Sequence, residues 1–341
     1  MCGIVGYIGK RRAYDVLIQG LHRLEYRGYD SSGVAMITEP GELNIYKSKG
    51  KVSALEHFAS NKDISGTIGI AHTRWATHGE PNDTNAHPHF SQSGRIAMVH
   101  NGTIENYSVL KKALSTHGYT FVSQTDTEVA VQLIEYIMDT NHCSLFDAVR
   151  EATKQIVGAY AIAIVDRQNP NQIIAARQSS PLVIGVGEGE YFLASDATPI
   201  IEYTNKVVYL DDGDIAVIDR GAELKIYDNA THNKSNIKIT ELQMSIEQLE
   251  KGGYEHFMLK EIFEQPKAVH DTLHPRLRDG RVVLDGIELT AENKKQFLIP
   301  RGFAHGFLVL SETAEFCYKC DDFYHPEDEG GIMYDSAGIE W

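Results

Sequence analysis

The order in which strand-like and helix-like stretches follow one another is the feature that most constrains the fold of this chain. Short apolar runs come first, as in 4–8 and 33–38, helical patterns occupy 106–157, and strand-like runs dominate 158–227. Elements grouped in such blocks are typical of antiparallel sheets, whereas strict alternation of strand and helix is typical of a doubly wound parallel sheet. We therefore expect a layered α+β protein with antiparallel sheets.

Hydrophobic spacing predicts where the helices of this chain begin and end. Apolar side chains recur at intervals of three and four residues, which indicates one buried helix face, in 13–24, 106–116, 127–139, 144–157 and 254–264. Asp126 is a natural N-cap for the third of these helices. Pro266 is expected to stop the last one, because proline removes a helical hydrogen bond.

Charge and cysteine content exclude several classes of protein. The chain has 47 acidic and 32 basic residues and a formal net charge of -15, so it repels phosphate backbones and anionic lipid surfaces. Its 4 cysteines are too few for a disulfide scaffold. The apolar run 159–165 is much shorter than the roughly 20 residues of a membrane helix. We expect a soluble, cytoplasmic protein without nucleic-acid or membrane partners.

Cys2, directly after the initiator methionine, is the most informative single residue. Removal of Met1 before a small side chain would leave Cys2 with a free α-amine. The amine has a pKa of roughly 7.7–8.0 and the thiol one of about 8.5, so both titrate near neutral pH. An N-terminal nucleophile can use its own amine as general base, directly or through a water molecule. The alternative is a small buried residue at the start of a strand.

Six stretches of the N-terminal part resemble the motifs of one known family. They occur in register at 2–7, 24–33, 72–79, 85–89, 100–102 and 123–128. Together they closely resemble the glutaminase domain of glutamine–fructose-6-phosphate aminotransferases (isomerizing), over about residues 2–284. The resemblance implies the four-layer αββα sandwich of N-terminal-nucleophile hydrolases and hydrolysis of L-glutamine to glutamate and ammonia. It implies no metal in this domain, and we expect no cofactor.

The residue types in these stretches suit glutamine as a substrate. Glutamine is a zwitterion: Arg74 can bind its carboxylate with a bidentate guanidinium, and Asp126 can take its ammonium group. The side-chain amide of Asn101 and the backbone N–H of Gly102 could stabilise the oxyanion that forms when the Cys2 thiolate attacks the amide. The resemblance implies the same roles for these four positions.

The resemblance also implies further residues around the substrate. Trp75, Thr77, His78 and Gly79 match a loop that encloses it, and Arg27 matches an arginine near the nucleophile on the hinge side.

Several histidines could suggest a metal centre instead. His72, His78, His87 and His89 lie close together in the sequence, but no cysteine pair or HExxH motif accompanies them. We therefore expect structural or loop histidines.

The C-terminal part departs from this pattern. We expect a glutaminase domain over 2–240, a linker resembling the entry to sugar isomerase domains over 241–285, and a separate β segment over 286–341. The last segment resembles part of the dTDP-4-dehydrorhamnose 3,5-epimerases, which are jelly rolls of the cupin type. In this resemblance Tyr318 matches the proton donor and His305 a substrate-contacting histidine.

Two alternatives to a glutaminase remain open from the sequence. One is an epimerase named from the tail, which is disfavoured because the upstream motif carrying that family's catalytic base is missing. The other is a non-catalytic fusion product. A partial jelly roll exposes unpaired strand edges, which would allow a homo-oligomer through 286–341. Only 341 − 266 = 75 residues follow Pro266, too few for the two isomerase domains of the resembled family. We therefore expect only the glutaminase half-reaction.

Overall fold

The computed structural model describes part of the chain in detail. These residues are 2–39, 41–76, 79–228, 233–234, 237–242, 254, 257–273, 277–278 and 281–282. The chain divides into two compact units, Met1–Leu249 and Glu250–Trp341. The finer boundaries expected at 240 and 285 stay predictions.

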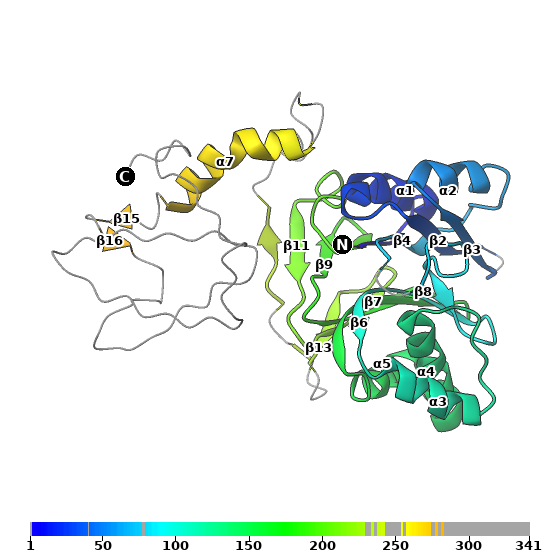
Figure 1. Cartoon of the computed structure of the whole chain (residues 1–341). Helices are drawn as coiled ribbons and strands as arrows, with labels where there is room; N and C mark the ends of the chain where they lie inside the picture. Colours follow the sequence, from blue (N-terminus) through cyan, green and yellow to red (C-terminus); the bar gives the residue numbers. More distant parts are fainter. Residues whose placement is uncertain are drawn as a thin grey trace, which may run out of the picture. The chain divides into compact units, whose positions relative to one another are not determined.

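Two antiparallel sheets form the centre of the first unit (Figure 1). The eight-stranded sheet has the order β14-β11-β9-β10-β1-β4-β2-β3 and the six-stranded sheet the order β13-β12-β8-β7-β6-β5. The strands of the first sheet are β1 (Gly3–Ile8), β2 (Ser31–Ile37), β3 (Leu43–Lys49), β4 (Ile68–Arg74), β9 (Val183–Val186), β10 (Tyr191–Ala194), β11 (Lys206–Tyr209) and β14 (Thr240–Glu241). Those of the second are β5 (His89–Phe90), β6 (Ile96–Ile104), β7 (Gly158–Asp166), β8 (Asn169–Gln178), β12 (Ile215–Asp219) and β13 (Lys225–Tyr227).

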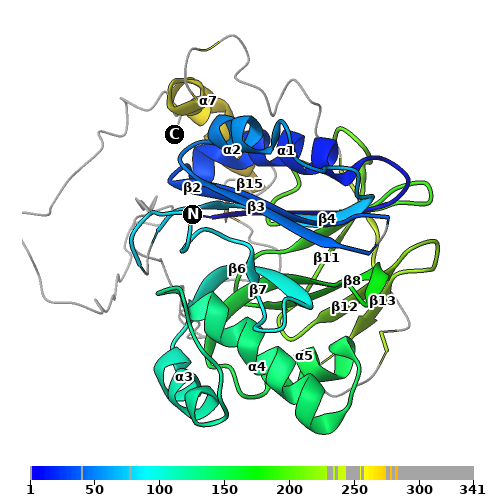
Figure 2. The same cartoon turned by 90° about the vertical axis from the view of Figure 1, so that its right-hand side faces the viewer.

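Helices cover the outer face of each sheet, as Figures 1 and 2 show. Helices α1 (Ala13–Leu24) and α2 (Val52–Ala59) lie on the first sheet. A 3-10 turn, Glu25–Arg27, follows α1 directly. Helices α3 (Tyr107–Thr116), α4 (Asp126–Asn141) and α5 (Leu145–Thr153) lie on the second. The predicted four-layer αββα sandwich is therefore confirmed for this unit.

Side chains alternate along each strand between the core that separates the two sheets and the core under the helices. In β1, Ile4 and Ile8 belong to the core between the two sheets, whereas Val5 and Tyr7 pack under the helices. In β6, Val99 likewise faces the inter-sheet core, while other members of the strand pack against α4. Because both faces are buried, these strands read as continuous apolar runs rather than as alternating ones.

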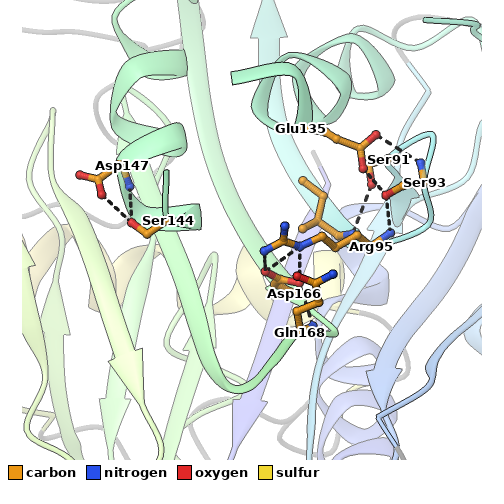
Figure 3. Close-up of polar contacts among 9 residues, drawn as sticks. Ser91, Ser93, Arg95, Glu135, Ser144, Asp147, Asp166 and Gln168 are labelled. Atoms are coloured by element: carbon orange, nitrogen blue, oxygen red, sulfur yellow. Dashed lines mark hydrogen bonds and ion pairs between the residues drawn. The ribbon is translucent and has the colours of Figure 1, made fainter. Parts of the chain in front are cut away.

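Polar contacts hold one end of strands β6 and β7 and the turn that precedes β6 (Figure 3). The Arg95 guanidinium donates to the Asp166 carboxylate across β6 and β7, with Nη2 and Oδ2 2.7 Å apart. Glu135 of α4 accepts hydrogen bonds from the backbone N–H and the hydroxyl of Ser93. The bonds between Ser93 and Glu135 hold the turn between β5 and β6 against α4.

Two expectations about helix ends are wrong. The N-cap of α4 is Thr125, whose Oγ1 accepts from the backbone N–H of Glu128, and Asp126 is the first helical residue. The reason is that the Asp126 carboxylate accepts the backbone N–H of Ile104 and is not used to cap its own helix. Helix α5 ends at Thr153, four residues before the predicted end.

The described part of the second unit begins with a helix. Helix α7 (Phe257–Leu273) continues through Pro266, so the expected stop at this proline is wrong. A proline inside a helix costs one hydrogen bond, and helices that tolerate this loss are the known exception. Strands β15 (Leu277–Arg278) and β16 (Arg281–Val282) pair with each other. The predicted β segment 286–341 lies outside the described residues.

Among the helices that the structure describes, none is long and apolar enough to cross a membrane.

Candidate active site

Cys2 lies immediately before β1, a strand in the middle of the first sheet. Antiparallel pairing of β1 with β4 places Gly3 opposite Thr73, so the chain at Trp75 comes next to Cys2. The Sγ atom of Cys2 accepts from the Trp75 backbone N–H at 3.3 Å and donates to the Trp75 carbonyl at 3.6 Å. A side chain at Gly3 would meet Thr73 Oγ1 at 2.7 Å, so only glycine fits beside Cys2.

Burial dominates the electrostatics of the Cys2 thiol. It raises the pKa of the thiol above its ordinary value, with a smaller contribution in the same direction from the Asp30 charge. The Trp75 hydrogen bond and the Arg74 charge lower the same pKa without cancelling the effect. At neutral pH the thiol is therefore protonated, and its activation needs a base.

Asn101 reaches Cys2 from the second sheet. Its Nδ2 donates to the Cys2 carbonyl oxygen at 3.2 Å, and its Oδ1 lies 2.9 Å from Nε2 of His72. Gly102, the next residue of β6, has a φ of +129°, and a Cβ there would lie 2.0 Å from the Ala159 carbonyl oxygen. Only glycine can take this conformation next to β7. The pair predicted to form an oxyanion site thus has one member, Asn101, in direct contact with Cys2.

Arg74 and Asp126 are buried charges; Arg74 acts on the Cys2 thiol, and Asp126 acts on Arg74. Arg74 ends β4 and is 4% exposed, and Asp126 at the start of α4 is 6% exposed. The guanidinium donates to the carbonyls of Gly79 at 3.3 Å and Glu80 at 3.4 Å. Burial lowers the pKa of Arg74, while the negative charges of Asp30, Cys2 and Asp126 raise it. Opposite charges from the first sheet and from helix α4 therefore act on Arg74, which in turn acts on the thiol.

The remaining predicted residues are only partly described. Trp75 is exposed and packs edge-to-face on Tyr29, with ring centroids 5.6 Å apart. Gly79 has a φ of +77° and lies exposed beyond Arg74. Thr77 and His78, together with the side chain of Arg27, lie outside the described residues, as do His305 and Tyr318 of the C-terminal segment.

Asp30 belongs to this site although the motif analysis gave it no role. Its carboxylate accepts the Ala76 backbone N–H, and its own backbone N–H donates to the Arg74 carbonyl at 3.1 Å. Asp30 thus holds the chain on both sides of Trp75. Its signal in the sequence is an acidic residue inside the matched stretch 24–33.

Four buried histidines lie behind the site. His72 and His87 stack with ring centroids 4.2 Å apart, and His87 and His89 lie 4.9 Å apart. Burial lowers the pKa of His72 to about 3 and those of His87 and His89 well below their ordinary value. The pKa of His100 is lowered for the same reason. These rings are neutral, and in the described part of the chain no three potential ligands converge on a metal position.

Residues 72–202 match the family model described as a glutamine amidotransferase domain. The chain carries a glutamine amidotransferase domain. Residues 281–341 match a second model, described as dTDP-4-dehydrorhamnose 3,5-epimerase. Both resemblances inferred from the sequence are confirmed.

Individual relatives extend the match over most of the chain. The glutamine–fructose-6-phosphate aminotransferase (isomerizing) of Bacteroides thetaiotaomicron is 60% identical over 308 residues, which is 88% of this chain and 49% of that protein. The enzyme of the same name from Chlorobaculum tepidum is 52% identical over 303 residues, 87% of this chain and 48% of its own. The chain spans about half the length of these curated relatives.

A solved structure supports the amidotransferase fold. It is the glutamine phosphoribosylpyrophosphate amidotransferase from B. subtilis, with a TM-score of 0.56 and 27% identity, covering 69% of this chain and 50% of that one.

Proposed function

We propose that this chain hydrolyses L-glutamine to L-glutamate and ammonia, with Cys2 as the nucleophile. The observation that supports the proposal is the arrangement of three buried groups from different elements: Asn101 contacts the Cys2 backbone, Arg74 acts on the Cys2 thiol, and Asp126 acts on Arg74. A buried cation, a buried carboxylate and a side-chain amide donor are the groups that a glutamine hydrolase needs.

The reaction proceeds through a thioester. The Cys2 sulfur attacks the side-chain carbonyl carbon of glutamine while its proton passes to a base, and the C–N bond breaks as ammonia leaves with that proton. Water then cleaves the thioester to glutamate and restores the thiol. Because burial raises the pKa of the thiol, a base is required, and the α-amine that Cys2 gains on loss of Met1 is suitably placed and has a suitable pKa.

The substrate is held through both of its charged groups. In this proposal Arg74 binds the glutamine carboxylate and Asp126 its ammonium group, while Oδ2 of Asp126 also accepts the Ile104 backbone N–H. Asn101 and Gly102 stabilise the oxyanion. Trp75, Thr77, His78 and Gly79 enclose the substrate, and Arg27 lies on the hinge side, as the resemblance implies.

The relatives' names indicate an acceptor for the ammonia that glutamine releases. The names of the relatives pair glutamine with fructose 6-phosphate, and this chain spans about half of those proteins. We propose that the 341-residue chain alone carries out the glutaminase half-reaction, in the cytoplasm, and releases free ammonia. Epimerase activity is not proposed, because the match covers only 281–341 and the motif of the catalytic base is missing. Self-association through 286–341 stays a prediction.

The decisive experiment measures glutamate and ammonia released from glutamine. Cys2→Ala should abolish release while the circular dichroism spectrum stays that of the wild type. The matched control is Cys143→Ala, which removes the other free cysteine among the described residues and should leave the rate unchanged. Wild-type activity that survives in Cys2→Ala would refute the mechanism. Blocking removal of Met1 should reduce the rate to nearly the same extent, because it caps the amine.

A further inference from the structure

A chain of hydrogen bonds behind Cys2 fixes the orientation of the Asn101 amide. Nε2 of His72 lies 3.1 Å from the His100 carbonyl oxygen and 2.9 Å from Oδ1 of Asn101. A peptide carbonyl can only accept, so Nε2 of His72 must carry the proton. An Asn101 amide that turned its NH₂ group towards this N–H would place two donors face to face.

The other end of the Asn101 amide agrees with this assignment. Its Nδ2 donates to the Cys2 carbonyl, which also can only accept. A flipped amide would therefore lose both of its hydrogen bonds at once, in a buried position where unpaired polar groups are costly. The His100 carbonyl therefore determines each orientation in turn. It requires the proton on Nε2 of His72, this N–H requires Oδ1 of Asn101 to face it, and the Nδ2–H groups of Asn101 then point towards Cys2.

The His72 ring is held rigidly enough to impose this order. It is fully buried and stacks on His87 at 4.2 Å with 26° between the ring planes. Its strand, β4, pairs on both sides, with Ile4 and Gly33 opposite His72. Turning the ring over by 180° would put the Cε1 carbon in the place of Nε2 and lose both of these contacts, and Nδ1 has no hydrogen-bond partner among the described residues that would compensate.

We propose that His72 is a positioning residue of glutamine hydrolysis, whose Nε2–H holds the Asn101 amide with its Nδ2–H donors towards Cys2. Nδ2 has two hydrogens: the Cys2 carbonyl takes one, and the second is left for the oxyanion of the tetrahedral intermediate. A preorganised donor stabilises that charge without reorganisation, whereas a flipped amide would oppose it with a carbonyl oxygen. The inference rests on the proposed glutaminase activity.

The kinetic test compares two substitutions of similar size. His72→Met removes the donor and should lower kcat for glutamine by about 10- to 100-fold, up to the loss known for an oxyanion donor, with KM changed less than about threefold. His72→Gln keeps an N–H donor near the position of Nε2 and should recover most of kcat. His89→Met is the matched control: a buried histidine whose ring contacts the Thr125 hydroxyl. This substitution should cost stability but leave kcat unchanged.

A double-mutant cycle separates positioning from general damage. In an Asn101→Ala background, His72→Met should have no further effect on kcat, because its effect passes through the Asn101 amide. Inhibition by the aldehyde analogue of glutamine, which forms a tetrahedral adduct with a thiol, should weaken in parallel with kcat, while inhibition by glutamate stays unchanged. Additive losses in the cycle, or equal kcat losses in His72→Gln and His72→Met, would overturn the inference.

One measurement needs neither a variant nor activity. In the wild-type protein, ¹⁵N NMR of His72 should show a protonated Nε2 and a bare Nδ1 at neutral pH, and the opposite tautomer would overturn the inference even if His72→Met fails to fold. A wild-type chain that does not hydrolyse glutamine would refute the proposed function instead. Full activity in the wild type with an unchanged kcat in His72→Met would refute the role of His72 alone.

Discussion

Asp30 and Ala76 are joined by a hydrogen bond from the Ala76 backbone N–H to the Asp30 carboxylate. Asp30 precedes β2 and Ala76 follows β4, so this contact fixes the first residues beyond Arg74 against a neighbouring strand. Trp75, which lies between Arg74 and Ala76, contacts the Cys2 sulfur through its backbone. The same carboxylate therefore positions the loop and exerts its charge on the nucleophile.

This arrangement predicts the effect of removing the Asp30 charge. Burial is the main cause of the raised pKa of Cys2, and the Asp30 charge adds to it. A nearby negative charge disfavours the thiolate, so Asp30→Asn should lower the thiol pKa. The pH dependence of Cys2 alkylation by iodoacetamide, followed by mass spectrometry, measures the shift. Asp15→Asn, on the exposed side of α1, should leave the profile unchanged; a profile that moves to higher pH in Asp30→Asn would contradict this electrostatic account.

Replacing Arg74 should separate substrate binding from folding. A charge-assisted, bidentate pair with a carboxylate is worth roughly 1.5–3 kcal/mol, so Arg74→Ala should reduce kcat/KM for glutamine by about 10- to 100-fold. Arg74→Lys keeps the charge but not the planar guanidinium, so its kcat/KM should lie between those of the wild type and Arg74→Ala. Steady-state kinetics on glutamine tests this prediction. Wild-type kinetics in Arg74→Ala would show that another residue binds the substrate carboxylate.

Much of this site could be predicted from sequence patterns, and the rest could not for a definite reason. Helix α1 was predicted with its observed bounds, because its apolar spacing is regular. The contact of His72 with Asn101 joins two different sheets, and strand periodicity does not determine how two sheets stack. The N-cap of α4 was missed because the partner that takes up the Asp126 carboxylate, Ile104, lies in β6.

The buried histidines should make the fold sensitive to acid. Burial holds the pKa values of His72, His87, His89 and His100 below the ordinary value near 6.5. Below pH 6.5 the unfolded chain therefore binds protons that the folded chain does not, and the free energy of unfolding falls as the pH falls. Each histidine contributes at most about 1.4 kcal/mol per pH unit.

A single substitution measures one histidine's share of this slope. His87→Gln replaces a titrating ring by an amide that does not titrate, so urea unfolding between pH 7 and 4.5 should show a shallower slope than the wild type. The absolute stability falls as well, since the stack on His72 is lost. His57→Gln, at an exposed position at the end of α2, serves as the control with an unchanged slope. Equal slopes in His87→Gln and the wild type would contradict the prediction.

Lys47 should add a pH dependence of the same sign, but at alkaline pH. It lines a cavity of about 350 Å³ together with Asp83, Thr84 and His89. Its Nζ donates to the Thr84 carbonyl at 3.2 Å. Burial lowers the pKa of Lys47 from 10.5 to about 8. Between pH 8 and about 10.4 the unfolded chain holds a proton that the folded chain has lost, so Lys47 makes the free energy of unfolding rise with pH in this window.

At pH 7 both states are protonated, and the folded state carries the full cost of burying the ammonium group. Lys47→Met keeps the apolar stem and removes the charge, at the expense of the bond to Thr84. We expect it to raise the free energy of unfolding by about 1–2 kcal/mol at pH 7 after the lost hydrogen bond is subtracted, with the gain shrinking towards pH 10. Lys49→Met, exposed on the same strand, should give no gain at either pH. Guanidinium unfolding at pH 7, 8.5 and 10 checks both variants. A Lys47→Met protein that is less stable than the wild type at pH 7 would show that the buried charge of Lys47 is not destabilising. A gain in the free energy of unfolding that stays constant with pH would show the same.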